Sequence, residues 1–271
     1  MLDAQVTITI IGLLIGLILA LTGAGGSIVA LPILIFSLNL RPQQAAPIVL
    51  IALFIASSIG AIHGLRKGTV RYKAASLMAF FGMLIAPIGV YLAHRISDTT
   101  LSLVLVLVLV LVAYRMWQSA IEKTQSNSEM SEQACAINPA TSKLFWTASC
   151  TKRLILTGGA TGFLSGLLGV GGGFFIVPSL YKVSNFSSQT IVNTTLATVA
   201  LISISSVATY WHRSEIQWDL AIPFVISTTV AMLAFTRLHH KIPSTISKKG
   251  FALLCLAAAI VLFITKIIKA F

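Results

Sequence analysis

The chain contains long, almost uninterrupted apolar segments, and these constrain its fold more than any other feature. Eight are present, at residues 5–38, 45–63, 74–93, 100–117, 153–181, 190–210, 220–237 and 249–268. Helices of this length can cross a hydrocarbon core of about 30 Å, whereas barrel strands are about half as long and alternate with polar residues. Since only helices and closed barrels satisfy their backbone in lipid, the sequence predicts an all-α integral membrane protein.

The composition supports this fold class, because 56% of the 271 residues are hydrophobic and only 10% are charged. The net charge is +12, from 19 Lys and Arg against 7 Asp and Glu. In a soluble protein such an excess would suggest nucleic-acid binding, but here the basic residues lie in short loops, as in the cytoplasmic loops of membrane proteins. The positive field could also concentrate anions near a pore mouth. We therefore expect the lipid bilayer as a partner and no nucleic acid.

Neither the N-terminus nor the cysteines suggest processing or a cross-link. The first residues lack a basic region and an A-x-A cleavage site, so we expect them to remain as a membrane element. Cys135, Cys150 and Cys255 have no metal-binding or redox spacing, and their odd number predicts no disulfide framework. We expect neither a metal nor a cofactor.

The chain is an internal duplication. A polar linker at 119–149 separates a first half, 1–118, from a second half, 150–271. Adding 146 to a position in the first half gives its counterpart, which matches Gly12 to Gly158, Gly16 to Gly162, Gly23 to Gly169, Gly25 to Gly171, Gly26 to Gly172, Pro32 to Pro178, Gln43 to Gln189 and Ser57 to Ser203. Random apolar sequence does not match Gly, Pro and Gln in one ungapped register. We therefore expect two homologous repeats of four segments each.

Each repeat opens with a segment that is too long for one straight crossing. Residues 5–38 would form a helix of about 51 Å, and glycines interrupt this segment at 23–26 and its counterpart at 169–173. Glycine and proline both disfavour a continuous helix. We predict that each opening segment is a glycine-broken helix made of two half-helices.

The loop charges favour inverted repeats. If each broken segment dips into the membrane and returns, each repeat crosses an odd number of times and the basic residues divide 14 to 5 between the two sides. If it crosses once, the repeats are parallel and the division is 12 to 7. Loop 63–73 carries four Lys and Arg, whereas its counterpart 209–219 has only Arg213 with two carboxylates. Opposite charge in homologous loops is typical of inversion.

The glycine breaks are the first candidate binding site. The half-helix after each break offers unpaired N–H groups and the positive end of its dipole, so two such ends meeting near mid-membrane could hold an anion without a formal cation. Alternatively, these glycines only allow close helix packing. The residues concerned are Thr22, Gly23, Gly25, Gly26 and Ser27 in the first break, and Gly169, Gly171, Gly172 and Gly173 in the second.

Uncharged polar residues in the second and sixth segments form the other candidate group, which either lines a pathway or only bonds helices together. These residues are Gln43, Ser57, Gln189, Asn193 and Thr194. All seven carboxylates lie in loops or at segment ends, so no proton relay or sodium cage of the usual kind is available. No nucleophile–base pair is present either, so we expect no catalytic residues and no enzyme. Anion export from an inside-negative cell is driven by about 2.3 kcal/mol per charge per 100 mV, so a uniporter would suffice.

The duplicated pattern resembles the TauE/SafE family of sulfite exporters over nearly the whole chain. The resemblance rests on G-x(6)-G-x-G-G-x(5)-P around Gly16–Pro32, its copy around Gly162–Pro178, and the basic loop HGLRKGTVRY at 63–72. It implies a transporter of sulfite, sulfonates or related organosulfur anions, usually outward across the bacterial cytoplasmic membrane. The first break reads GAGGS and the second GVGGG, so the two sites need not be equivalent. A passive anion channel, a membrane scaffold and a homodimer stay open.

Overall fold

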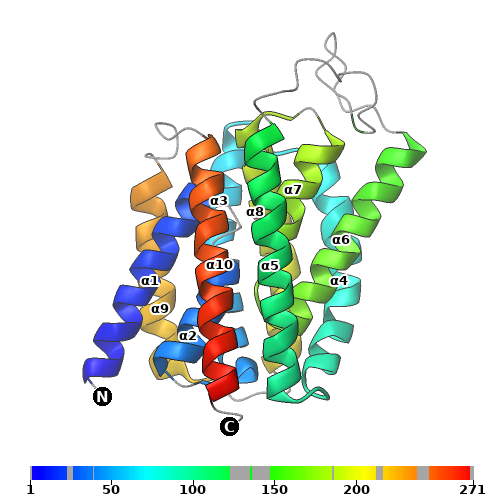
Figure 1. Ribbon diagram of the computed structural model, residues 1–271. Coiled ribbons are helices and arrows are strands. Elements are labelled where there is room, and N and C mark those ends of the chain that lie inside the picture. Colours follow the sequence, from blue (N-terminus) through cyan, green and yellow to red (C-terminus); the bar gives the residue numbers. More distant parts are fainter. Residues whose placement is uncertain are drawn as a thin grey trace.

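The computed structural model describes residues 2–22, 27–38, 40–122, 135, 147–184, 186–211, 216–236 and 244–268. Within these residues the fold is a bundle of helices (Figure 1). The first half contains α1 (Leu2–Thr22), α2 (Ser27–Leu38), α3 (Pro42–Arg66), α4 (Tyr72–Ala93) and α5 (Asp98–Glu122). The second half contains α6 (Ala148–Leu168), α7 (Gly173–Val183), α8 (Ser188–Trp211), α9 (Trp218–Thr236) and α10 (Ser244–Ile268).

The predicted all-α membrane class is confirmed. Among the described residues, five helices are long and apolar enough to cross a membrane by length and composition, namely α3, α4, α5, α8 and α9. Shorter apolar helical stretches cover 5–20, 27–38 and 252–264. Two predicted segments, 5–38 and 153–181, are each divided between two helices.

Helices of one half pack mainly against helices of the other half. α1 packs along α9, and its counterpart α6 packs along α4. α3 packs against its own counterpart α8, and α5 against α10. Glycines bring the backbones together, because a Cβ on Gly158 or Gly162 would overlap the backbone of α4, and a Cβ on Gly12 or Gly16 would overlap α9. Small residues commonly allow such close packing between membrane helices.

The bundle has two distinct ends. α1 begins and α10 finishes at one end, where Figure 1 marks both termini; we call this the terminal end. α5 finishes and α6 begins at the opposite end, which we call the linker end. The α3–α4 turn also lies at the linker end, because α4 and α5 together lead from that turn to the terminal end and back. α5 and α10 lie side by side and run in opposite directions (Figure 1).

One face of α5 is buried. The run LVLVLVLVLVLV at 101–112 looks uniformly apolar and suggests a lipid-facing helix. In the structure, Leu101, Leu105 and Leu109 are buried, whereas Leu103 and Leu107 are exposed. Leucines four residues apart share a helix face, so this helix packs against α10 along one stripe and leaves the other open to lipid.

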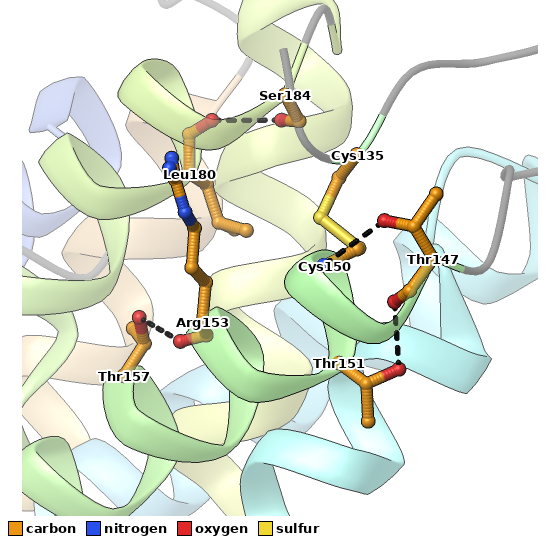
Figure 2. The surroundings of a disulfide bond; sticks show 8 residues. All are labelled: Cys135, Thr147, Cys150, Thr151, Arg153, Thr157, Leu180 and Ser184. Carbon is orange, nitrogen blue, oxygen red and sulfur yellow. Dashed lines mark hydrogen bonds between the residues drawn. A yellow bond between two sulfur atoms is a disulfide. The ribbon is translucent and has the colours of Figure 1, made fainter. Parts of the chain in front are cut away.

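Cys135 and Cys150 form a disulfide, so the prediction of no disulfide framework is wrong. Cys150 lies in the first turn of α6 (Figure 2). The Cys135 N–H donates to the carbonyl of Val183 at the end of α7 (3.0 Å). The odd count misled because one cysteine, Cys255 on α10, is buried and unpaired while the other two meet. The disulfide therefore holds Cys135 against α6, and the hydrogen bond holds it against α7. Most of the predicted linker lies outside the described residues, although α5 itself continues to Glu122.

Candidate functional site

Left-handed glycines separate α6 from α7. Gly169, Gly171 and Gly172 have φ of +69°, +66° and +65°, a region that glycine occupies at little cost and other residues avoid. Gly169 ends α6 by donating its N–H to the carbonyl of Ser165 (2.8 Å). Gly172 is the residue before α7, and it has no side chain to cap the N–H groups of that helix. The first N–H groups of α7 therefore have no side-chain oxygen of the capping residue to accept their hydrogen bonds.

The start of α2 lies against the second break. Ser27, the first residue of α2, donates a hydrogen bond from Oγ to the carbonyl of Val170 in the second break (2.7 Å), and both groups are buried. The bond joins positions 143 residues apart, and α2 also contacts α7. It brings the start of the first half's short helix onto the break of the second half. Gly23, Gly25, Gly26 and the side chain of Thr22 lie outside the described residues.

Helices α3, α6 and α8 enclose the second break. A Cβ on Gly169 would meet Ala46 Cα at 2.7 Å, and one on Gly171 would meet Leu53 Cδ1 at 2.5 Å and Val199 Cγ1 at 3.3 Å. Leu53 on α3 and Val199 on α8 are counterparts in the duplication. The break is thus held between the corresponding helices of the two halves, and larger residues do not fit there.

Buried hydroxyl groups near this region have no hydrogen-bond partner among the described residues. Thr161 on α6 lies against Gly172, since a Cβ on that glycine would meet the Thr161 carbonyl at 2.7 Å. The Oγ1 of Thr161 is unpartnered, and so are the Oγ atoms of Ser57 and Ser203. Leaving a buried hydroxyl unpaired costs about 1–3 kcal/mol, so each group would gain from a ligand that accepts or donates a hydrogen bond. Thr228 and Thr229 on α9 are unpartnered as well.

Thr161 was not among the residues predicted from the sequence. Its counterpart in the first half is Ile15, so no polar residue is matched at this position when the two halves are aligned. A lone threonine within an apolar segment usually bonds to the backbone of its own helix, and the pattern carries no sign that this one does not. Ser203 is the counterpart of the predicted Ser57, and the duplication itself points to it.

The remaining predicted residues lie nearer the ends of the bundle. At the linker end, Asn193 Nδ2 donates to Thr69 Oγ1 (2.7 Å), and Thr194 Oγ1 accepts from the Arg71 backbone N–H (3.0 Å). These bonds fasten α8 to the α3–α4 turn. At the terminal end, Gln43 Nε2 donates weakly to the Ala93 carbonyl (3.4 Å), while its buried Oε1 has no partner among the described residues. Gln189 is half-buried in the first turn of α8.

Charge is distributed unequally between the two ends. Among the described side chains, the linker end carries a group of basic residues, namely Arg66, Lys67, Arg71, Lys73, Lys152 and Arg153. The two carboxylates whose side chains the structure describes, Asp98 and Asp219, are both at the terminal end, where Arg41 Nε lies 4.0 Å from Asp98 Oδ2. In the same described part of the chain, no three His, Cys, Asp or Glu residues gather to form a metal site.

A model of the family described as "Sulfite exporter TauE/SafE" matches residues 8–262. A probable membrane transporter protein of Xylella fastidiosa (strain Temecula1 / ATCC 700964) is 26% identical over 252 residues, which cover 92% of this chain and 91% of the relative. The probable membrane transporter protein YunE of Bacillus subtilis (strain 168) is 24% identical over 231 residues, which cover 81% and 83%. MJ0441 of Methanocaldococcus jannaschii, which bears the same description, is 22% identical over 250 residues, covering 89% and 86%. No solved structure matches.

Proposed function

The chain belongs to the sulfite exporter TauE/SafE family, and on that premise we propose that it exports small sulfur-containing anions, sulfite or sulfonates, across the bacterial cytoplasmic membrane. The family name and the relatives described as membrane transporters support transport rather than enzymatic chemistry. The main structural support for the site is the hydrogen bond from Ser27 to Val170, which joins the start of α2 to the second break.

The anion is held at the second break, where the start of α2 meets the residues before α7. The N-terminus of α7 offers backbone N–H groups and the positive end of a helix dipole, and a glycine precedes it instead of a capping side chain. Thr161 lies against Gly172 through its methyl and carbonyl groups, and its buried hydroxyl, which has no partner among the described residues, supplies a further donor to the same anion. Backbone dipoles and hydroxyls suit a cargo that must be released again, since they bind it without a fixed countercharge. Ser57 and Ser203 are further hydroxyls on the two helices that enclose the break.

The two halves act as inverted repeats. The packing of α1 on α9 and of α6 on α4 relates the halves by a pseudo-two-fold axis, and the opposite directions of α5 and α10 support inversion (Figure 1). In inverted-repeat transporters, rocking of one bundle against the other exposes a central site alternately to the two sides. The symmetric position of Ser57 and Ser203 on α3 and α8 fits such an axis.

The linker end faces the cytoplasm and collects the anion. The basic residues of the α3–α4 turn and of the α6 start lie there, as cytoplasmic segments require, and their field attracts anions from the inside. Outward movement of an anion then follows the membrane potential, at about 2.3 kcal/mol per charge per 100 mV. No coupling ion is needed.

The test is sulfite flux in proteoliposomes with Thr161→Val and a matched control, Thr198→Val. Both threonines are fully buried, but Thr198 Oγ1 already donates to the Thr194 carbonyl within its own helix (2.9 Å). A hydrogen bond to a charged group contributes about 1.5–3 kcal/mol, so Thr161→Val should weaken apparent sulfite affinity about 10- to 150-fold. Thr198→Val should change it little.

Equal affinity in the two variants would contradict the site. The same assay separates a carrier from a passive channel, because a carrier saturates and shows counterflow whereas a channel does neither. Absence of flux with sulfite, taurine and sulfoacetate would contradict the proposed cargo.

A further inference from the structure

The disulfide fastens a point of the linker to α6, the helix that ends at the second break. Cys135 is bonded to Cys150 in the first turn of α6 (Figure 2). The backbone N–H of Cys135 donates to the carbonyl of Val183, the last residue of α7. α7 in turn begins directly after Gly172. Cys135 therefore connects the helices on both sides of the break, covalently to α6 and by one hydrogen bond to α7.

The bond lies on the side of the membrane where permanent disulfides are rare. It is at the linker end, beside Lys152 and Arg153 and at the same end as the basic α3–α4 turn, which points to the cytoplasm. In the reducing cytosol, disulfides of ordinary proteins are usually transient and are catalytic or redox-sensing. A purely structural role does not explain a disulfide in that position.

Burial restricts what can reach this bond. The exposed fractions are 1% for Cys135 and 0% for Cys150. Thiol–disulfide exchange requires the attacking sulfur to approach one of the two sulfurs directly, so a protein reductase cannot dock here. A small anionic sulfur nucleophile needs only a local displacement of the covering chain.

We propose that the Cys135–Cys150 bond is a reaction site for sulfite, through which the cargo controls its own transporter. The sulfite sulfur attacks Cys135 Sγ, a new S–S bond forms to give Cys135–S–SO₃⁻, and the electron pair of the old bond leaves on Cys150 as thiolate. Neither an added oxidant nor a reductant is required. When sulfite falls, the Cys150 thiolate attacks Cys135 Sγ, expels sulfite and restores the disulfide. This inference rests on the proposed function, because it takes sulfite as the cargo.

The surroundings favour Cys150 as the leaving group. Cys150 is the third residue of α6, and its N–H donates to Oγ1 of Thr147, the residue that caps the helix (3.1 Å). A helix N-terminus stabilises a thiolate. A better-stabilised thiolate leaves faster from a disulfide. Cleavage then removes the covalent tie between Cys135 and α6 and leaves Cys135 joined to α7 by its hydrogen bond, so the two helices beside the break are no longer linked through Cys135.

The first test is the chemistry itself, on the full-length protein purified in detergent with Cys255→Ala to remove the third thiol. Native protein is treated with sulfite or with an equal concentration of glutathione, then analysed by peptide mass and maleimide labelling. We expect sulfite to place one sulfonate on Cys135 and to free one thiol at Cys150, while glutathione reacts only after denaturation. An intact bond after native sulfite treatment would overturn the proposal, and so would equal cleavage by glutathione. The proposal would also be overturned if thiol trapping in unstressed cells found both Cys135 and Cys150 as free thiols.

The second test asks whether cleavage changes transport, with sulfoacetate as a cargo that does not attack disulfides. Sulfite pretreatment should raise sulfoacetate flux severalfold in the wild type and in Cys255→Ala. Cys135→Ser/Cys150→Ser should be fast without pretreatment and should not respond. Cleavage without any change of flux would overturn the control role. Failure of every anion to move, with Cys135 still sulfonated, would instead count against the proposed transport function.

Discussion

Substituting alanine for glycine at two positions with the same left-handed φ measures how tightly the second break is enclosed. Gly171 and Gly68 both have φ of +66°, but nothing lies within 4 Å of a Cβ on Gly68, whereas a Cβ on Gly171 would meet Leu53 Cδ1 at 2.5 Å and Val199 Cγ1 at 3.3 Å. The left-handed conformation costs an alanine about 1–2 kcal/mol at either site. Forcing an extra methyl into a packed interior adds about 1–3 kcal/mol.

Gly171→Ala should therefore lower the free energy of unfolding by about 2–5 kcal/mol, and Gly68→Ala by about 1–2 kcal/mol. The measurement is reversible unfolding in mixed micelles, titrated with a denaturing detergent and followed by tryptophan fluorescence. The difference between the two variants isolates the enclosure, since the backbone term is common to both. Equal losses would show that α3 and α8 do not close around the break. No loss in either variant would refute the left-handed geometry.

Three other changes test the packing and the site. Ser27→Ala removes the bond between α2 and the second break and should cost about 0.5–1.5 kcal/mol in the same unfolding titration, together with a loss of sulfite affinity. Unchanged affinity would show that this bond does not contribute to binding. Gly162→Leu should prevent stable assembly, because even a Cβ would overlap the α4 backbone, whereas Gly250→Leu, with open space around it, should assemble normally by size-exclusion chromatography. Ser57→Ala/Ser203→Ala removes two unpartnered hydroxyls, so it should leave the free energy of unfolding unchanged or slightly raised while it slows sulfite flux. A clear loss of stability would show that both hydroxyls are hydrogen-bonded.

Segment length and glycine position made the fold predictable. A helix of 34 residues cannot fit a hydrocarbon core of about 30 Å, and in the structure the segment 153–181 is indeed divided, with α6 ending at Leu168 and α7 beginning at Gly173. The buried face of α5 was harder to predict. An unbroken Leu-Val run has no polar residue to mark which side meets another helix, so its orientation depends on α10.

The site was only partly predictable, because a hydrogen bond across the bundle depends on which helices meet. Ser27 belonged to the candidate group, but its acceptor Val170 is a backbone carbonyl and leaves no mark in the sequence. Thr161 has an apolar counterpart and no motif. The Cys135–Cys150 bond requires Cys135, which lies between α5 and α6, to meet the first turn of α6, and the spacing of the cysteines along the sequence does not reveal this.

The exchange of packing partners between the halves has a consequence for biogenesis. α1 and α4 leave the ribosome long before their packing partners α9 and α6 exist. The glycine-bearing faces of α1 and α4 therefore contact lipid until the second half is inserted. The first half is therefore an assembly intermediate rather than an independent folding unit. Each half supplies packing partners that the other half needs, so neither can be lost. Two separately synthesised halves should become protease-resistant only when they are produced in the same membrane.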